Sequence, residues 1–161
     1  MTNNGWQEVA FQPQDVELMN SWIIGAGVNI PLGDTIPFAY GSLTFLFEPE
    51  LTGHWGSQDL FELDLPVTAR YQFPKRILGL NTFAFGIGPS YATEPPPVEQ
   101  QRGKGGSENT LIYWKIEIGH DLTTLPGASV FARLHHRSSG FGLMGESGSM
   151  NAVVVGFRQA F

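Results

Sequence analysis

Apolar and polar residues alternate along most of this chain with a period of two. The alternation is clearest from Phe61 to Phe73 and from Ile112 to His120, and it recurs from Thr82 to Tyr91 and near the end of the chain. Successive side chains of a β-strand point to opposite faces, so this period predicts strands with one apolar face. The pattern predicts eight of them, at residues 5–11, 17–30, 38–52, 59–73, 80–92, 109–120, 128–138 and 150–161.

The second face of these strands combines glycines and small residues with charges of both signs. Either the apolar face is buried, as in a soluble β-sandwich or soluble barrel, or it faces lipid around a polar lumen. The lumen of an eight-stranded barrel has just enough room for side chains, which suits a mixture of small and paired charged residues. We therefore predict a single all-β domain over residues 1–161, an eight-stranded antiparallel transmembrane β-barrel of the outer-membrane type. Its expected lumen ion pairs involve Glu62, Asp64, Arg70, Lys115, Glu117, Arg133 and Arg158.

The connections between the predicted strands fall into two kinds. Residues 31–37, 74–79 and 121–127 are compact turns with Pro or Gly, whereas 93–108 and 139–149 are longer and polar. Short turns at one end and longer loops at the other are typical of outer-membrane barrels. An even number of strands predicts that both termini lie at the short-turn end.

Composition supports a surface that meets lipid. Only 15% of the residues are charged, against roughly a quarter in a typical soluble domain. The net charge of −6 argues against a nucleic-acid partner, and the absence of cysteine excludes disulfides and thiolate metal sites. Phosphate-loop, zinc and calcium motifs are absent, so we expect no cofactor and no metal, with His54 at the surface of an outer loop. We expect a bacterial outer-membrane protein whose signal peptide has been removed, since no such peptide opens the chain.

His136 and Ser138 are the candidate reactive pair. They lie two apart on a predicted strand, which puts them on one face about 7 Å apart. At that spacing a serine can act as nucleophile and a histidine as its base, with a third group to orient the imidazole. Asn151 on the next strand or Glu146 in the intervening loop could be that third group, while His135 faces the lumen. The alternative is that these residues belong to the headgroup zone, where such polar groups are common.

The segment from Phe131 to Phe161 resembles the end of the lipid A 3-O-deacylase family of Gram-negative outer membranes. The pair His136-Arg137-Ser138 matches the His-x-Ser pair of that family, one strand before the C-terminus. The stretch from Leu60 to Glu99 is similar to uncharacterised barrels often grouped with it. The resemblance implies an eight-stranded barrel that removes an ester-linked acyl chain from lipid A, with lipopolysaccharide as its partner.

Three positions depart from the family pattern. Ser139 stands where the family has an Asn that helps to hold the oxyanion, and Asn151 stands where it has a triad Glu, if one residue is inserted in the loop. Residues 145–149 replace its Pro-Asn-Pro-Gly-like loop. The resemblance thus implies Ser139 and the backbone near Gly140 at the oxyanion, with Asn151 or Glu146 orienting the histidine. The alternative is a non-catalytic barrel that maintains the membrane or binds a protein through its outer loops.

Overall fold

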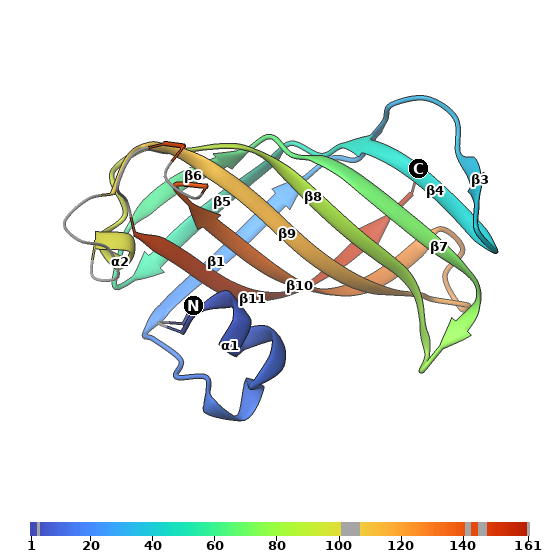
Figure 1. The fold of residues 1–161 in the computed structure, drawn as a ribbon, viewed down its shortest axis with the longest axis horizontal. Coiled ribbons are helices and arrows are strands. Elements are labelled where there is room, and N and C mark those ends of the chain that lie inside the picture. The colour runs from blue at the N-terminus through green and yellow to red at the C-terminus, as the bar shows by residue number, and fades with distance from the viewer. Residues whose placement is uncertain (3, 101–106, 141–142, 145–147, 161) are drawn as a thin grey trace.

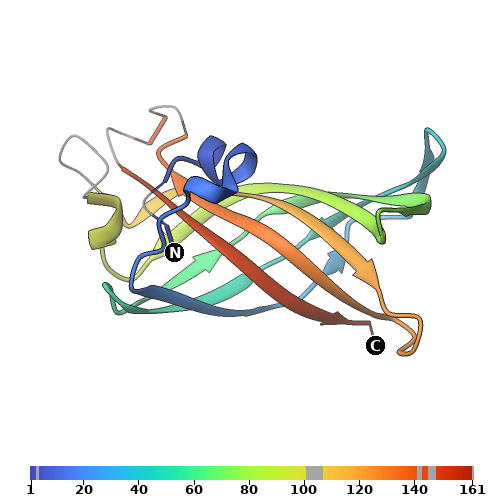
Figure 2. The ribbon, with the colours of Figure 1, turned by 90° about the horizontal axis from the view of Figure 1, so that it is seen from below.

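The protein folds as an antiparallel sheet that curls into a nearly closed barrel (Figures 1 and 2). The computed structural model describes residues 1–2, 4–100, 107–140, 143–144 and 148–160. The strands are β1 (Ser21–Gly27), β2 (Ile30–Pro31), β3 (Ile36–Phe38), β4 (Gly41–Phe47), β5 (Glu50–Gly56), β6 (Leu60–Asp64), β7 (Val67–Ile77), β8 (Leu80–Ala92), β9 (Thr110–Asp121), β10 (Ala128–Ser138) and β11 (Ser149–Gln159). The helical segments are α1 (Trp6–Phe11), η1 (Pro13–Asp15) and α2 (Pro97–Gln100). Within the described chain, none of the helices is long and apolar enough to cross a membrane.

These segments join into seven continuous strands across the described residues. β1 and β2 keep one register against β5 and β4, and the register is also unchanged across the break between β4 and β5 and the break between β6 and β7. Further along, β7 shifts against β8 between Gln72 and Ile77. Pro49 and Pro66 lie in two of the breaks, because proline has no N–H to donate to the neighbouring strand. The prediction of an all-β antiparallel barrel is therefore confirmed, but the predicted number of eight strands is wrong.

The difference arises at residues 5–11, where Trp6–Phe11 form helix α1 instead of a strand. The Gly5 N–H donates to the Glu8 carboxylate (2.9 Å) at the start of the helix, and Pro13 begins a separate 3-10 turn. The helix lies on the outside of the barrel wall over β10 (Figure 2). Trp6 anchors it by an edge-to-face contact with Trp114 of β9, with ring centroids 5.6 Å apart.

A seam separates the first and last strands of the sheet. In the described chain β1 pairs with β5 alone and β11 with β10 alone. Thr2 bridges one end of the seam by pairing with Leu18 and with Asn151. A cavity of about 370 Å³ lies in the seam, lined by Met1, Thr2, Leu18, Trp22, Ile23, Ala152 and Val153.

The termini of the sheet lie at opposite ends of the barrel. β1 starts at the end that carries α2, and β11 finishes at the other end (Figure 1). An odd number of strands requires this arrangement, so the expectation that both termini lie at the short-turn end is wrong.

The barrel has polar residues inside and apolar residues outside. Phe85 on the outer wall is 40% exposed, while the side chain of Arg70 in the lumen is only 15% exposed. Outward apolar residues occur on all seven strands, among them Trp22, Phe45, Phe61, Phe83, Ile118, Val130, Val155 and Phe157. Buried residues that face the lumen include Glu62, Asp64, Lys115, Glu117, Arg133, His135 and Arg137. The two faces predicted from the alternation therefore point in the expected directions.

Candidate functional site

His136 and Asn151 form a hydrogen-bonded pair across β10 and β11. The two residues are direct partners in the strand register, and Nδ1 of His136 lies 2.6 Å from Oδ1 of Asn151. Nδ2 of Asn151 donates to the carbonyl oxygen of Asn4 (2.8 Å), which fixes the orientation of the Asn151 amide. Since an amide oxygen can only accept, Nδ1 carries the proton, and in the neutral imidazole the lone pair is on Nε2.

Ser138 lies two residues beyond His136 on β10, partly exposed and near the end of the strand. Its Oγ accepts a hydrogen bond from the N–H of Gly140 (3.4 Å). Among the described residues no hydrogen bond joins the Ser138 hydroxyl to the His136 imidazole. The structure thus brings Asn151 to His136 but leaves the Ser138 hydroxyl on a different partner.

His136 is on the outer face, as its position in the strand predicts, but it is not open to the surroundings. Only 5% of the residue is exposed. The indole of Trp114 stacks over the imidazole with centroids 4.4 Å apart and ring planes tilted by 32°, and Trp6 of α1 packs on that indole. The N-terminal helix and Trp114 therefore cover the base of the candidate pair.

The turn after Ser138 depends on a glycine. Gly140 has a positive φ of 60°, a backbone conformation that other residues rarely adopt. A Cβ at this position would also meet the side chain of Ile112, which would have to shift. The carbonyl of Ser139 accepts from the N–H of Met144 (3.0 Å), which closes the turn. Glu146, the other candidate for orienting the histidine, lies outside the described residues.

The lumen contains a connected set of ion pairs. Six of the seven residues predicted to form such pairs make an ion pair, whereas Asp64 has no cationic partner among the described residues. Buried charges are tolerated when they are paired, so these contacts account for a charged interior. The pairs include Arg70–Glu48 (2.6 Å), Lys115–Glu48 (2.7 Å), Arg133–Glu117 (2.8 Å), Arg158–Glu117 (2.8 Å), Arg133–Glu50 and Arg137–Glu62 (3.9 Å). His54 also contacts Glu62 (2.8 Å).

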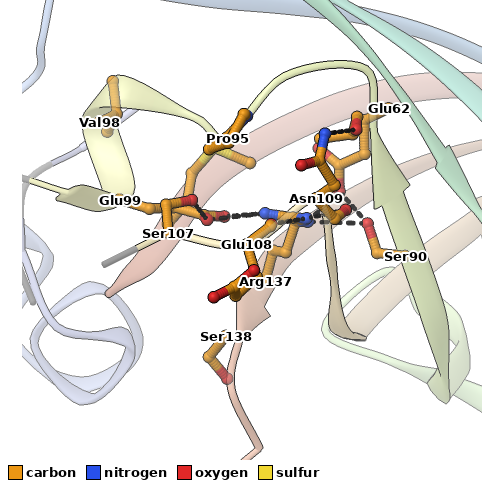
Figure 3. Close-up of polar contacts among 12 residues, drawn as sticks. Glu62, Ser90, Pro95, Val98, Glu99, Ser107, Glu108, Asn109, Arg137 and Ser138 are labelled. Carbon is orange, nitrogen blue, oxygen red and sulfur yellow. Dashed lines mark hydrogen bonds and ion pairs between the residues drawn. The ribbon is translucent and has the colours of Figure 1, made fainter. Parts of the chain in front are cut away.

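A second buried cluster joins α2 to the barrel, and the sequence analysis missed it. Nη1 of Arg137 donates to both carboxylate oxygens of Glu99 (2.6 and 2.7 Å). Nη2 donates to the carbonyls of Glu108 (2.9 Å) and Asn109 (2.6 Å), and Nε donates to Oγ of Ser90 (2.9 Å), as Figure 3 shows. Burial raises the pKa of the Glu99 carboxyl above the ordinary range, and the Arg137 guanidinium opposes that shift.

The position of Arg137 could have been predicted, but its partner could not. Arg137 has the same strand parity as Arg133 and His135, which assigns it to the lumen. Glu99 lies in α2, within the stretch 93–108 that the sequence predicts as a loop, where no period fixes the direction of a side chain. Ser138, which follows Arg137 on β10, points away from this cluster (Figure 3).

The expectation for His54 is wrong. Instead of lying in a surface loop, His54 belongs to β5 and is 3% exposed. Its Nε2 contacts Oε2 of Glu62 at 2.8 Å. β5 extends beyond the predicted strand 38–52, although Gly53 and Gly56 on either side of His54 are typical of a turn.

Comparison of the chain with models of protein families, with curated proteins and with solved structures found no match. The fold and the site therefore define a class only: a nearly closed antiparallel barrel of seven strands with a charged lumen and an apolar outer wall. The similarity to lipid A 3-O-deacylases stays a prediction from the sequence.

Proposed function

We propose that this protein is a barrel of the bacterial outer membrane that hydrolyses an ester-linked acyl chain of lipid A. The proposed place in the membrane rests on the apolar side chains that cover the outside of the barrel. Monomeric soluble proteins rarely expose large contiguous apolar patches, because water solvates them poorly. Lipid removes this cost, and the charged lumen with its ion pairs is the usual interior of a membrane barrel.

The proposed hydrolysis of an ester rests on the hydrogen bond between His136 Nδ1 and Asn151 Oδ1. This bond leaves Nε2 as the basic atom on the face of β10 that also holds Ser138. A base oriented by a third group, beside a hydroxyl, is the arrangement that activates a serine nucleophile. Its place on the outer wall, at the end of the barrel with the longer connections, suits an ester in a lipid headgroup.

The reaction has two stages in this proposal. The Ser138 hydroxyl attacks the acyl carbonyl while His136 Nε2 takes its proton, and backbone N–H groups near Gly140 face the oxyanion. The sugar hydroxyl leaves with that proton, and the acyl group stays on Ser138. Water, deprotonated by His136, then attacks the acyl group, the fatty acid leaves, and His136 returns the proton to Oγ of Ser138. Asn151 orients the imidazole, although as a neutral amide it stabilises the imidazolium less than a carboxylate does.

Two movements must precede this reaction. The Ser138 hydroxyl has to leave the Gly140 N–H and approach His136, as catalytic hydrogen bonds often form only in the substrate complex. Trp6 and α1 have to yield to the substrate, because they cover His136 on the lipid side.

The covered histidine also favours a second candidate, a barrel without catalytic activity. In that reading the His136–Asn151 hydrogen bond and the Trp114 stack hold α1 on the wall. The protein would then serve membrane integrity or bind another protein through its outer loops.

Incubation of the purified chain in detergent with lipid A separates the two candidates. The esterase reading expects loss of one acyl chain by mass spectrometry, and a fall of at least about 10³-fold in Ser138→Ala, as for other serine nucleophiles. Ser57→Ala, in an exposed turn, serves as the matched control and keeps full activity. If wild type and Ser138→Ala both gave only background amounts of deacylated lipid A, the esterase reading would be wrong and the non-catalytic barrel would be favoured.

A further inference from the structure

Asp64 is the one lumen carboxylate that lacks a cation among the described residues. The residue is fully buried on β6, and neither of its carboxylate oxygens has a hydrogen-bond partner in the described part of the chain. The other lumen carboxylates, including Glu48 and Glu117, contact Arg or Lys or accept from histidine. An isolated buried carboxylate is costly, so such a group takes up a proton or a cation.

His135 faces Asp64 with an equally unsatisfied side chain. Its imidazole is fully buried, and neither ring nitrogen makes a hydrogen bond in the described structure. Nε2 lies 3.3 Å from Oε1 of Glu62, at an angle that does not make a hydrogen bond. Tyr113 packs against the ring with centroids 4.6 Å apart, which holds the imidazole in place.

One ligand atom each from Glu62, Asp64 and His135 lies within 4.8 Å of the other two. Ligand atoms about 2.1 Å from a tetrahedral zinc ion lie about 3.4 Å from one another, so the three side chains have to move toward each other by up to about 1.4 Å to close around a metal. The side chains come from β6 and β10, strands that do not pair with each other, and they meet across the lumen.

Hydrogen bonds from neighbouring side chains hold the Glu62 carboxylate in place. Gln58 Nε2 lies 2.8 Å from Nδ1 of His54, and because an amide NH₂ only donates, His54 donates from Nε2 to Glu62 Oε2 (2.8 Å). Ser90 donates from Oγ to Glu62 Oε1 (2.9 Å). Such contacts fix the direction of a ligating carboxylate and raise metal affinity.

We propose that Glu62, Asp64 and His135 form a divalent transition-metal site in the lumen, with zinc as the ion that fits best. One imidazole and two carboxylates suit Zn²⁺, whereas Ca²⁺ and Mg²⁺ prefer oxygen ligands alone. Three protein ligands leave a fourth position. The site faces the lumen, opposite to Ser138 and His136, so it does not depend on the proposed esterase activity.

The test is zinc retention by the full-length barrel. The purified chain is refolded in detergent with equimolar ZnCl₂, desalted and assayed for metal by mass spectrometry, and zinc affinity is then measured by calorimetry. We expect about one zinc ion per chain and a higher unfolding temperature than after refolding with EDTA. CaCl₂ in place of ZnCl₂ should give neither effect.

Three variants assign the site. Asp64→Asn and His135→Gln should each weaken zinc affinity by more than about 100-fold, since loss of a contact to a ligand already costs 10- to 100-fold. Asp59→Asn removes the same charge from an exposed turn and should bind like the wild type. Binding in a folded Asp64→Asn equal to that in Asp59→Asn, or no zinc on the wild type, overturns the proposal. If the wild type binds no zinc, the buried Asp64 carboxyl is held as the neutral acid instead.

Discussion

Arg137 shows how much one residue can connect. Its guanidinium bonds to Glu99 in α2, to two carbonyls before β9 and to Ser90 on β8. These partners come from three separate parts of the chain, so one side chain fixes α2 and its loop on the end of the barrel. Neither Arg137 nor Glu99 exposes any of its side chain, so both charges depend on each other.

Arg137→Ala should therefore destabilise the protein strongly. The substitution leaves the buried Glu99 carboxylate without its cation, which costs about 3–5 kcal/mol. Denaturant unfolding of the detergent-solubilised barrel measures the change. Arg76→Ala is the matched control, because Arg76 is exposed and makes one bond to a backbone carbonyl, and it should stay within about 0.5 kcal/mol of wild type. A similar small loss for both variants would show that the Glu99–Arg137 pair is not buried as described.

At the scale of elements, the hairpin that holds the candidate site was predictable from the sequence. The alternation in β10 and β11 puts His136 and Asn151 on one face, and the antiparallel pairing of the two strands sets them opposite each other. Residues 5–11 could not be assigned in this way, because seven residues are too short a segment to separate a period of two from a period of 3.6. The Glu62–Asp64–His135 cluster was also beyond the sequence, since it forms across the lumen and depends on the diameter of the barrel.

The position of α1 predicts a local change in protection when its anchor is removed. Trp6→Ala deletes the contact with Trp114, so α1 should leave the wall and lose most of its amide protection in hydrogen-exchange mass spectrometry. Phe11→Ala, in the same helix, changes a side chain that is 76% exposed and should leave the protection as it is. Equal exchange of residues 6–11 in all three proteins would mean that Trp6 does not hold the helix.

At the scale of the whole molecule, the apolar wall allows a test that distinguishes lipid from water around it. Val155 lies in the middle of β11 and is 80% exposed on the outer face. Leu78 is 97% exposed, in the tight turn between β7 and β8, at one end of the barrel. In a soluble protein an arginine at either position would be harmless, since exposed substitutions change stability by no more than about 0.5 kcal/mol.

A barrel in a bilayer must behave differently at the two positions. Val155→Arg places a charge in hydrocarbon and should cost about 2–4 kcal/mol, whereas Leu78→Arg, outside the apolar band, should cost no more than about 1 kcal/mol. Reversible unfolding in phospholipid vesicles measures both, and the same pair of variants in detergent micelles gives the reference. If Val155→Arg folds into vesicles with the stability of Leu78→Arg, the wall does not face lipid. The apolar surface would then have to be covered by protein.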